Sequence, residues 1–350
     1  MNLSVGIVGL PNVGKSTLFN ALRKTQGKLA QVGNYPFTTI EPNVGVVPVK
    51  DARLEKLAQI EKEENKMDSL PPIIYAIVSF VDIAGLVKGA YKGEGLGNKF
   101  LAHIREVSAI CQVVRFFKDT NVTHVSETPD PNSDIETVNT ELILADLQTV
   151  EKSKIKDKIA NLATEKVALG LNEGKMVRDL GLSSEELEQV KSLQLLTAKP
   201  MFIVANISED QLNESLPPDF IAISAKVEAE LAALSEDEQE EYLKSLGVSE
   251  SGLDKIVKKG YEILDLISFL TAGIKEVRAW TIKKGTNAQK ASGVIHTDFE
   301  KKFIKAEVVS FDDFVSCGGW KKARELGKAR LEGRDYIMKD GEVVEFKIGT

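Results

Sequence analysis

Short apolar runs alternate with amphipathic stretches over the first part of the chain. Five runs are apolar and rich in β-branched residues, which is typical of buried strands. They cover residues 3–8, 73–83, 113–117, 201–205 and 220–224. The first run ends in a glycine-rich turn, and a helix is predicted from Ser16 to Leu22. Strands that alternate with helices favour an α/β fold with a mostly parallel sheet.

Residues 121–200 break this rhythm with helical spacing. Apolar residues recur every three or four positions from Asp134 to Leu162, with many Lys and Glu residues between them. Ser183 and Glu186 have the spacing of a capping box, which predicts a second helix that reaches Leu196. We expect the two helices to pair as an antiparallel hairpin that forms a separate lobe. The alternative is an ordinary helical excursion of the α/β domain.

The pattern changes again near Thr271. The strand-like runs VRAWTI, FIKAEVVSF and VVEFKI alternate with turns, which predicts a small mixed β domain. The predicted organisation is therefore an α/β domain at residues 1–120 and 201–272, a helical hairpin at 121–200, and a C-terminal domain at 273–350.

The most specific motif is GLPNVGKS at residues 9–16, which matches the phosphate-binding P-loop. A strand precedes it and a helix follows, as the motif requires. Lys15 would place its charge on the β- and γ-phosphates, and the Ser16 hydroxyl suits Mg²⁺. The predicted phosphate-binding residues are Asn12, Val13, Gly14, Lys15, Ser16 and Thr17.

Asn12 is a candidate ligand for a monovalent cation. An amide oxygen at that loop position could bind K⁺ beside the phosphates. The alternative is that asparagine simply tolerates the turn conformation.

Asp82 and Gly85, in VDIAG, follow the second strong strand. After a P-loop, a carboxylate there can hold Mg²⁺ through water, and the Gly85 N–H can contact a γ-phosphate. Glycines recur from 85 to 97, which suits a switch segment that orders around the γ-phosphate. The alternative is a loose surface loop. Between the two motifs, either Thr38 or Thr39 could complete the Mg²⁺ coordination.

The residues expected at the base end do not match a guanine site. Many P-loop G proteins read guanine with N-K-x-D, but here Asn206 is followed by Ile207, Ser208 and Glu209. Without the aspartate that pairs with the guanine donors, selectivity for guanine is lost. Ser224 and Ala225 match the loop that touches the base through backbone groups. We therefore expect ATP to be favoured over GTP.

The motifs together resemble the bacterial YchF / Obg-like ATPase family over essentially the whole chain. The resemblance rests on GLPNVGKS, YPFTTIEPNVGVV, VDIAGLVKGAYKGEGLGNKFL, NISE and the long stretch from TAGIKEVRAW to VVSFDDF. It implies a P-loop G domain, an inserted helical hairpin and a C-terminal TGS domain of β-grasp type. It also implies ATP as substrate, ribosome association through the large subunit or the 70S particle, and Thr39 as the Mg²⁺ ligand beside Ser16.

One position departs from the family pattern. Leu86 stands where Ras-like enzymes carry the glutamine that orients water. In the family, a histidine before V-V-R is proposed to replace it, and here that position is Gln112. We expect slow hydrolysis, with Lys15, Gln112 and Gly85 as the catalytic residues. The alternatives are that Gln112 is only a strand residue, or that His103 takes the role.

Charge is divided unevenly along the chain. The 350 residues have a net charge of −7, which argues against nonspecific nucleic-acid binding. Residues 271–350, however, hold 16 basic and 12 acidic residues. The basic cluster with nearby aromatics predicts contact with ribosomal RNA, and the alternative is a solvated face. The cluster comprises Lys321, Lys322, Arg324, Lys328, Arg330 and Arg334.

The remaining features of the sequence predict the cellular compartment and the oligomeric state. Two cysteines, three scattered histidines, no signal pattern and no long apolar run predict a cytoplasmic protein without a zinc site or membrane contact. We expect a monomer or weak dimer. The leading hypothesis is a Mg²⁺-dependent ATPase whose nucleotide state controls ribosome binding. Its rivals are a GTPase of ribosome assembly and a nonenzymatic ATP-gated binding module.

Overall fold

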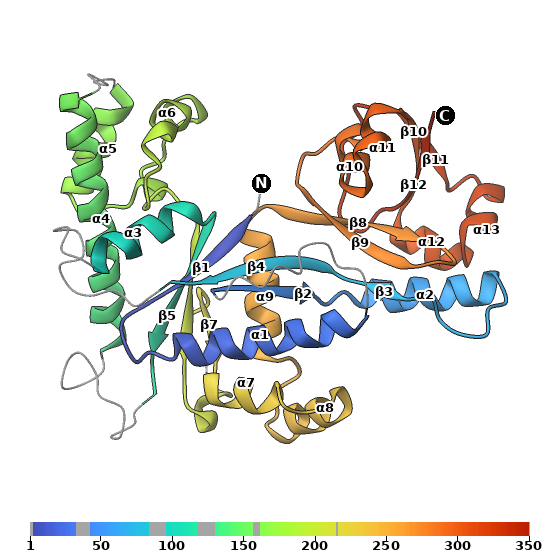
Figure 1. The fold of residues 1–350 in the computed structure, drawn as a ribbon, viewed down its shortest axis with the longest axis horizontal. Helices are drawn as coiled ribbons and strands as arrows, with labels where there is room; N and C mark the ends of the chain where they lie inside the picture. The colour runs from blue at the N-terminus through green and yellow to red at the C-terminus, as the bar shows by residue number, and fades with distance from the viewer. Residues whose placement is uncertain are drawn as a thin grey trace. The chain divides into compact units, whose positions relative to one another are not determined.

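A computed structural model describes residues 3–32, 43–83, 96–117, 130–156, 162–214 and 216–349 (Figure 1). The chain divides into two compact units. Unit 1 comprises residues 1–30, 35–47 and 79–260, and unit 2 comprises residues 31–34, 48–78 and 261–350. No helix among the described residues is long and apolar enough to cross a membrane.

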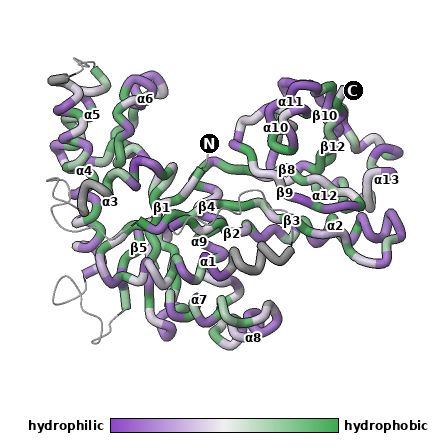
Figure 2. Tube along the Cα trace, viewed as in Figure 1, coloured by the Kyte–Doolittle hydropathy of each residue, from purple (hydrophilic) through white to green (hydrophobic). Residues whose placement is uncertain are grey.

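Unit 1 is built on a parallel α/β sheet, as predicted. The strand order is β2-β4-β1-β5-β6-β7, and the pairs from β4 through β7 are parallel. The strands are β1 (Ser4–Val8), β2 (Val44–Val49), β4 (Ala76–Asp82), β5 (Ala109–Arg115), β6 (Met201–Asn206) and β7 (Phe220–Ile223). Every residue of β1 and β5 is buried, which explains their nearly continuous apolar sequences (Figure 2).

Helices surround this sheet and follow its strands in the chain. They are α1 (Lys15–Val32), α3 (Leu96–Glu106), α7 (Ala225–Leu231), α8 (Glu236–Ser245) and α9 (Gly252–Ile263). Because the strands are parallel, the turns after β1, β5, β6 and β7 reach the same edge of the sheet. That edge is where ligands bind in open α/β folds.

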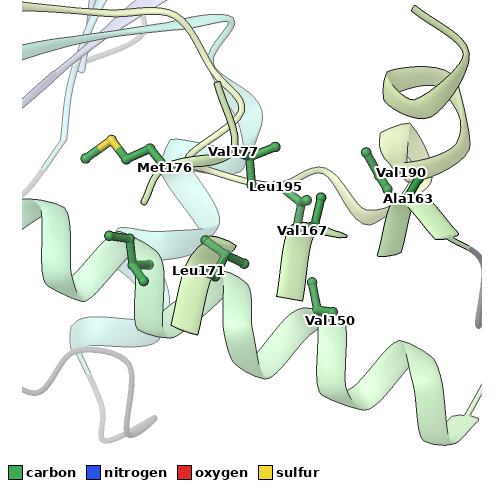
Figure 3. Packing of buried hydrophobic residues seen from close by; sticks show 9 residues of the cluster. Val150, Ala163, Val167, Leu171, Met176, Val177, Val190 and Leu195 are labelled. Atoms are coloured by element: carbon green, nitrogen blue, oxygen red, sulfur yellow. The ribbon is translucent and has the colours of Figure 1, made fainter. Parts of the chain in front are cut away.

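The region from residue 130 to 200 has its own apolar cluster (Figure 3). Its helices are α4 (Pro131–Lys156), α5 (Leu162–Asn172) and α6 (Ser184–Val190). The Ser183–Glu186 capping box is confirmed. The predicted pairing was wrong, because α5 lies along α4 while the helix after Ser183 stops at Val190. Val150 of α4 packs with Ala163 and Val167 of α5, and these apolar contacts hold the two helices together.

Unit 2 contains a mixed sheet with the strand order β11-β10-β12-β8-β9-β3. Its strands are β3 (Ile73–Ile74), β8 (Leu266–Ala272), β9 (Val277–Lys283), β10 (Phe303–Val309), β11 (Arg330–Glu332) and β12 (Val343–Ile348). The hairpin β8–β9 is antiparallel, and β12 lies parallel to β8 in the middle. This is the arrangement expected of a β-grasp fold.

Helices cover both faces of this sheet. They are α2 (Ala52–Glu64), α10 (Ala288–Ile295), α11 (Thr297–Lys301), α12 (Phe311–Cys317) and α13 (Trp320–Glu325). Phe269, Phe303 and Val344 form a core with α10. Helix α2 packs against β8, β9 and α12 through its fully buried Leu54 and Leu57.

The boundaries of the units differ from the predicted domain limits. Residues 48–78 lie with 261–350, although they were expected within the α/β domain. The predicted strand 73–83 is two strands, since β3 pairs with β9 and β4 pairs with β1. The break falls at Tyr75, whose hydroxyl donates to Glu55 of α2 at 2.5 Å. One apolar run therefore serves two different sheets.

Candidate functional site

The P-loop lies at the carboxyl end of β1 and opens helix α1. Asn12 and Gly14 both adopt positive φ angles, of 61° and 98°. A Cβ atom on Gly14 would collide with the side-chain amide of Asn206, so only glycine fits there. The left-handed conformation of Asn12 agrees with the view that asparagine tolerates this turn.

Lys15 is almost completely buried, with 8% of its surface exposed. Its Nζ donates to the backbone carbonyl of Leu10 at 2.7 Å. Burial lowers the pKa of Lys15 to about 8, an effect that the Asp82 charge opposes. Burial likewise raises the pKa of Asp82 while the Lys15 charge lowers it. The P-loop cation and the carboxylate that ends β4 therefore share one electrostatic environment.

Asn206, the last residue of β6, ties the P-loop to the loop after β7. Its Nδ2 donates to the Val13 carbonyl at 2.9 Å, and its Oδ1 accepts from the Ala225 N–H at 3.0 Å. The side chain is 3% exposed, so both hydrogen bonds are shielded from water. This one amide fixes the distance between the predicted phosphate and base regions.

A cavity of about 1460 Å³ joins these two regions. Its lining includes most of the predicted nucleotide-binding residues: Asn12, Gly14, Lys15, Ser16, Thr17, Asn206, Ile207, Glu209, Ser224 and Ala225. Val13 is not among the lining residues, because its side chain is fully buried. Its carbonyl accepts the hydrogen bond from Asn206 Nδ2.

The cavity also contains residues that the sequence did not suggest as ligands: Phe117, Ser208, Asp210, Asn213, Ala229, Glu230, Ser245 and Leu246. Phe117 follows β5 at the binding edge, so its position could have been predicted from the strand order. The guanidinium of Arg115 lies 4.4 Å from the Phe117 ring centre and donates to the Phe117 carbonyl at 3.2 Å. Leu246 follows α8, which was not predicted, although Ser235 and Glu238 have the spacing of the capping box that begins this helix.

The residues predicted for the base end, Ile207, Glu209, Ser224 and Ala225, line the same cavity as Asn206. Ile207 is 2% exposed and its N–H donates to the Ile223 carbonyl, which pins this position to β7. Glu209 is exposed and begins a short 3₁₀ turn capped by Ser208. The loop carries neither the lysine nor the aspartate of a guanine-reading motif.

Of the residues expected to hold Mg²⁺, Ser16 and Asp82 lie within the described residues. The Ser16 side chain is exposed at the cavity, and Asp82 is half-buried at the end of β4. Among the described residues there is no group of three or more His, Cys, Asp or Glu that could hold a metal. Mg²⁺ usually keeps several waters and takes oxygens from substrate phosphates, so one hydroxyl and one carboxylate are ligand types that suit it. Thr39 and Gly85 lie outside the described residues.

Comparisons with known proteins identify the family. A family model described as a 50S ribosome-binding GTPase matches residues 4–145, and a YchF-GTPase C-terminal model, described as a protein of unknown function, matches residues 266–349. The ribosome-binding ATPase YchF of Bacillus subtilis is 48% identical over 376 aligned positions, covering 100% of both chains. The chain belongs to the YchF family. Its Escherichia coli O157:H7 relative is 47% identical, with 99% of both chains covered.

A solved structure of the family has the same fold. The YchF GTPase of Schizosaccharomyces pombe superposes with a TM-score of 0.85 at 38% identity, and the match covers 99% of this chain and 98% of that one. The predicted resemblance and fold class are confirmed, including the P-loop domain with its mostly parallel sheet.

Gln112, at the position of the family histidine, lies outside the cavity. It is in the middle of β5, opposite Val8 of β1, and its side chain is fully buried. Neither its Nε2 nor its Oε1 has a hydrogen-bond partner among the described residues. His103, on α3, is exposed. The two candidates for water activation therefore have opposite environments, one sealed in the sheet and one at the surface.

Proposed function

We propose that this chain is a Mg²⁺-dependent ATPase that prefers ATP to GTP and couples its nucleotide state to ribosome association. The observation that carries the proposal is the cavity in which the P-loop Lys15 and Ser16 face a base loop without a guanine-reading aspartate. The names of the relatives, ribosome-binding ATPase YchF, support both parts of the proposal.

The phosphate end supplies positioning and charge. On nucleotide binding, Lys15 exchanges its hydrogen bond to the Leu10 carbonyl for phosphate oxygens, and the N–H groups at the start of α1 face the same oxygens. Ser16, Thr39 and Asp82 are the proposed Mg²⁺ residues, with Asp82 acting through water. When bound, Mg²⁺ neutralises charge that develops on the phosphates during transfer. Gly85 is the proposed backbone donor to the γ-phosphate.

The base end selects adenine because it lacks the aspartate that pairs with guanine. A guanine would leave its N1–H and N2–H₂ donors without the paired carboxylate acceptor, which costs affinity when the base is buried. Phe117, held by Arg115, provides an apolar wall for either purine. Backbone groups of Ser224 and Ala225 are the proposed polar contacts.

Gln112 is the proposed water-positioning residue. Burying an amide whose two polar atoms have no partner among the described residues is costly, which supports a role for Gln112 beyond packing. Because it is sealed within the sheet here, its action requires a local rearrangement around β5. Single-turnover ATP hydrolysis by Gln112→Ala tests this, with His103→Ala as the matched variant. A rate that falls at least 10-fold only for Gln112→Ala is expected, and an unchanged rate rejects the role.

A GTPase of ribosome assembly is the second candidate. It is favoured by the family model described as a 50S ribosome-binding GTPase and by the fission-yeast relative named a GTPase. Displacement of a fluorescent nucleotide by ATP and by GTP separates the two. We expect ATP to compete at least 10-fold better, and a strong GTP preference contradicts the ATPase proposal.

One further experiment tests nucleotide hydrolysis and its dependence on ribosomes and K⁺. Hydrolysis of ATP and GTP is measured with and without ribosomes at two K⁺ concentrations. A cytoplasmic ribosome-associated ATPase predicts turnover that ribosomes change, and a K⁺ dependence would assign Asn12 as a cation ligand. No turnover with saturating ribosomes would favour a nonenzymatic ATP-gated module.

A further inference from the structure

Two segments far apart in the chain form one edge of unit 2. The N–H of Met338 donates to the Thr286 carbonyl at 3.0 Å, and the N–H of Ala288 donates to the Tyr336 carbonyl at 2.8 Å. A further bridge joins Asn287 and Ile337. Residues 283–290 and 334–339 therefore form a continuous surface, which we call the basic edge.

The basic edge holds the excess positive charge of the C-terminal segment. Five basic side chains stand against one acidic residue, Asp335. The rest of residues 271–350 has equal numbers of basic and acidic residues, so the net charge of +4 resides here. All five are exposed: Lys283, Lys284, Lys290, Arg334 and Lys339. In the part of the chain that the structure describes, none of them forms an ion pair.

The predicted RNA-binding cluster on and after α13 is different. Arg324 pairs with Glu307 at 2.9 Å, Lys328 with Asp313 at 2.9 Å, and Arg330 with Glu332 at 3.1 Å. Cations already paired with carboxylates have little charge left for an external phosphate. Of the six predicted residues, Lys321, Lys322 and Arg334 form no ion pair with a described residue, and Arg334 belongs to the basic edge.

The chemistry of the edge favours a phosphate backbone. Exposed lysines gain affinity from polyphosphates by releasing condensed counterions, whereas single exposed lysine–carboxylate pairs contribute little. Tyr336, the aromatic residue of these two segments, is half-buried and its hydroxyl donates to Glu342. The edge therefore offers charge without exposed rings on which unpaired bases could stack.

We propose that the basic edge is the surface through which unit 2 contacts the phosphate backbone of structured RNA. The proposal rests on the proposed ribosome association and specifies where it occurs. Recognition by charge and backbone shape suits duplex regions, because their bases are not available for stacking.

The test uses the full chain with Lys283→Gln/Lys284→Gln and a matched double variant, Arg324→Gln/Lys328→Gln, whose two cations are paired with carboxylates. Binding to 70S ribosomes and to a labelled RNA hairpin is measured between 50 and 200 mM KCl. We expect the edge variant to lose roughly 10-fold or more in affinity, and the slope of log K against log salt to become shallower by about 1 to 2. The paired-cation variant should change less than about 2-fold, because Glu307 and Asp313 already neutralise its two cations. Lys283→Arg/Lys284→Arg should restore binding, and an unchanged thermal unfolding curve shows that the fold is intact.

The outcomes separate this proposal from the proposed function. Ribosome binding that survives in the edge variant, or falls equally in both variants, overturns the basic edge alone. Loss of ribosome binding with unchanged affinity for the RNA hairpin also overturns it, since the edge would then meet a ribosomal protein. A wild-type chain that binds neither ribosomes nor RNA overturns both the edge and the proposed ribosome association.

Discussion

The nucleotide cavity and the basic edge both offer positive charge to phosphates, but they hold that charge differently. Lys15 is 8% exposed and its Nζ is fixed on the Leu10 carbonyl. The cations of the basic edge are exposed and have no ion-pair partner among the described residues. Lys15 has therefore lost most of its surrounding water before a ligand binds, whereas the cations of the basic edge are still hydrated.

This difference predicts two kinds of recognition. A preorganised, water-poor site binds one phosphate geometry strongly and responds weakly to salt. A solvated edge binds any phosphate array and responds steeply to salt. The four predictions below test this contrast, from the largest expected effect to the smallest.

The largest effect is expected at Lys15. Lys15→Met keeps much of the buried length of the side chain but removes its charge from the phosphates. We expect ATP affinity to fall about 100-fold or more, because a charged hydrogen bond in a buried site contributes roughly 3 kcal/mol. Calorimetric ATP titration measures it. Ribosome binding of the nucleotide-free chain serves as the control and should be retained; a loss below 5-fold in ATP affinity contradicts the assignment.

Asn206 should give the next largest effect. Asn206→Ala leaves the Val13 carbonyl and the Ala225 N–H without partners in a buried position, which costs about 2 to 3 kcal/mol. We expect both lower thermal stability and a loss of ATP affinity of about 10-fold. Asn213→Ala is the matched control, since Asn213 lines the same cavity and makes one exposed hydrogen bond to Leu246. Equal effects of the two variants would show that the Asn206 junction has no special role.

The nucleotide site could be predicted from the sequence because its motifs are short and follow strands. Gly14 to Thr17, Asn206 and Ser224 each stand at the end of an apolar run, and parallel strands bring such ends to one edge. To place Phe117 in the cavity, one must know the order of the strands in the sheet, and the apolar pattern of the sequence does not give that order. Leu246 needed the packing of α8, whose sequence from Glu236 to Ser245 is mostly polar.

The second unit could be predicted only in part, because its contacts are remote in sequence. The strand patterns of β9, β10 and β12 were visible in the sequence, whereas β8 was not predicted. That α2 would cover this sheet, and that one run at 73–83 would divide between two sheets, depends on packing between residues about 200 positions apart. The pairing of three cations in the predicted cluster was not foreseen for a similar reason, since Glu307 pairs with Arg324 from a strand 17 positions away.

The pH dependence of ATP binding tests whether Lys15 is held in a water-poor site. Its pKa of about 8 in the free chain lies below the ordinary value of 10.5 because burial disfavours the charge. Below pH 8 the lysine is protonated and affinity should be flat. Above pH 8 binding must take up a proton, so affinity should fall by up to about 10-fold per pH unit. Calorimetry in buffers of different ionisation enthalpy at pH 9 measures the proton uptake. Lys15→Arg should show no such dependence, and a flat wild-type profile to pH 9.5 would contradict the lowered pKa.

The smallest effect is expected at Arg324, where the contrast between paired and unpaired cations is sharpest. Its guanidinium pairs with Glu307 and Glu345 and lies 5.2 Å from the Trp320 ring centre. The hydrogen bond that Arg324 donates, together with its charge, also lowers the pKa of Glu307. Arg324→Gln should therefore cost about 1 kcal/mol or less in the stability of unit 2, because the pair is partly exposed and screened. It should leave the salt slope of RNA binding unchanged, although it removes as much charge as Lys284→Gln. Urea denaturation and the RNA titration measure the two effects. An RNA affinity that falls as far for Arg324→Gln as for Lys284→Gln would mean that net charge, rather than the unpaired cations of the basic edge, determines binding.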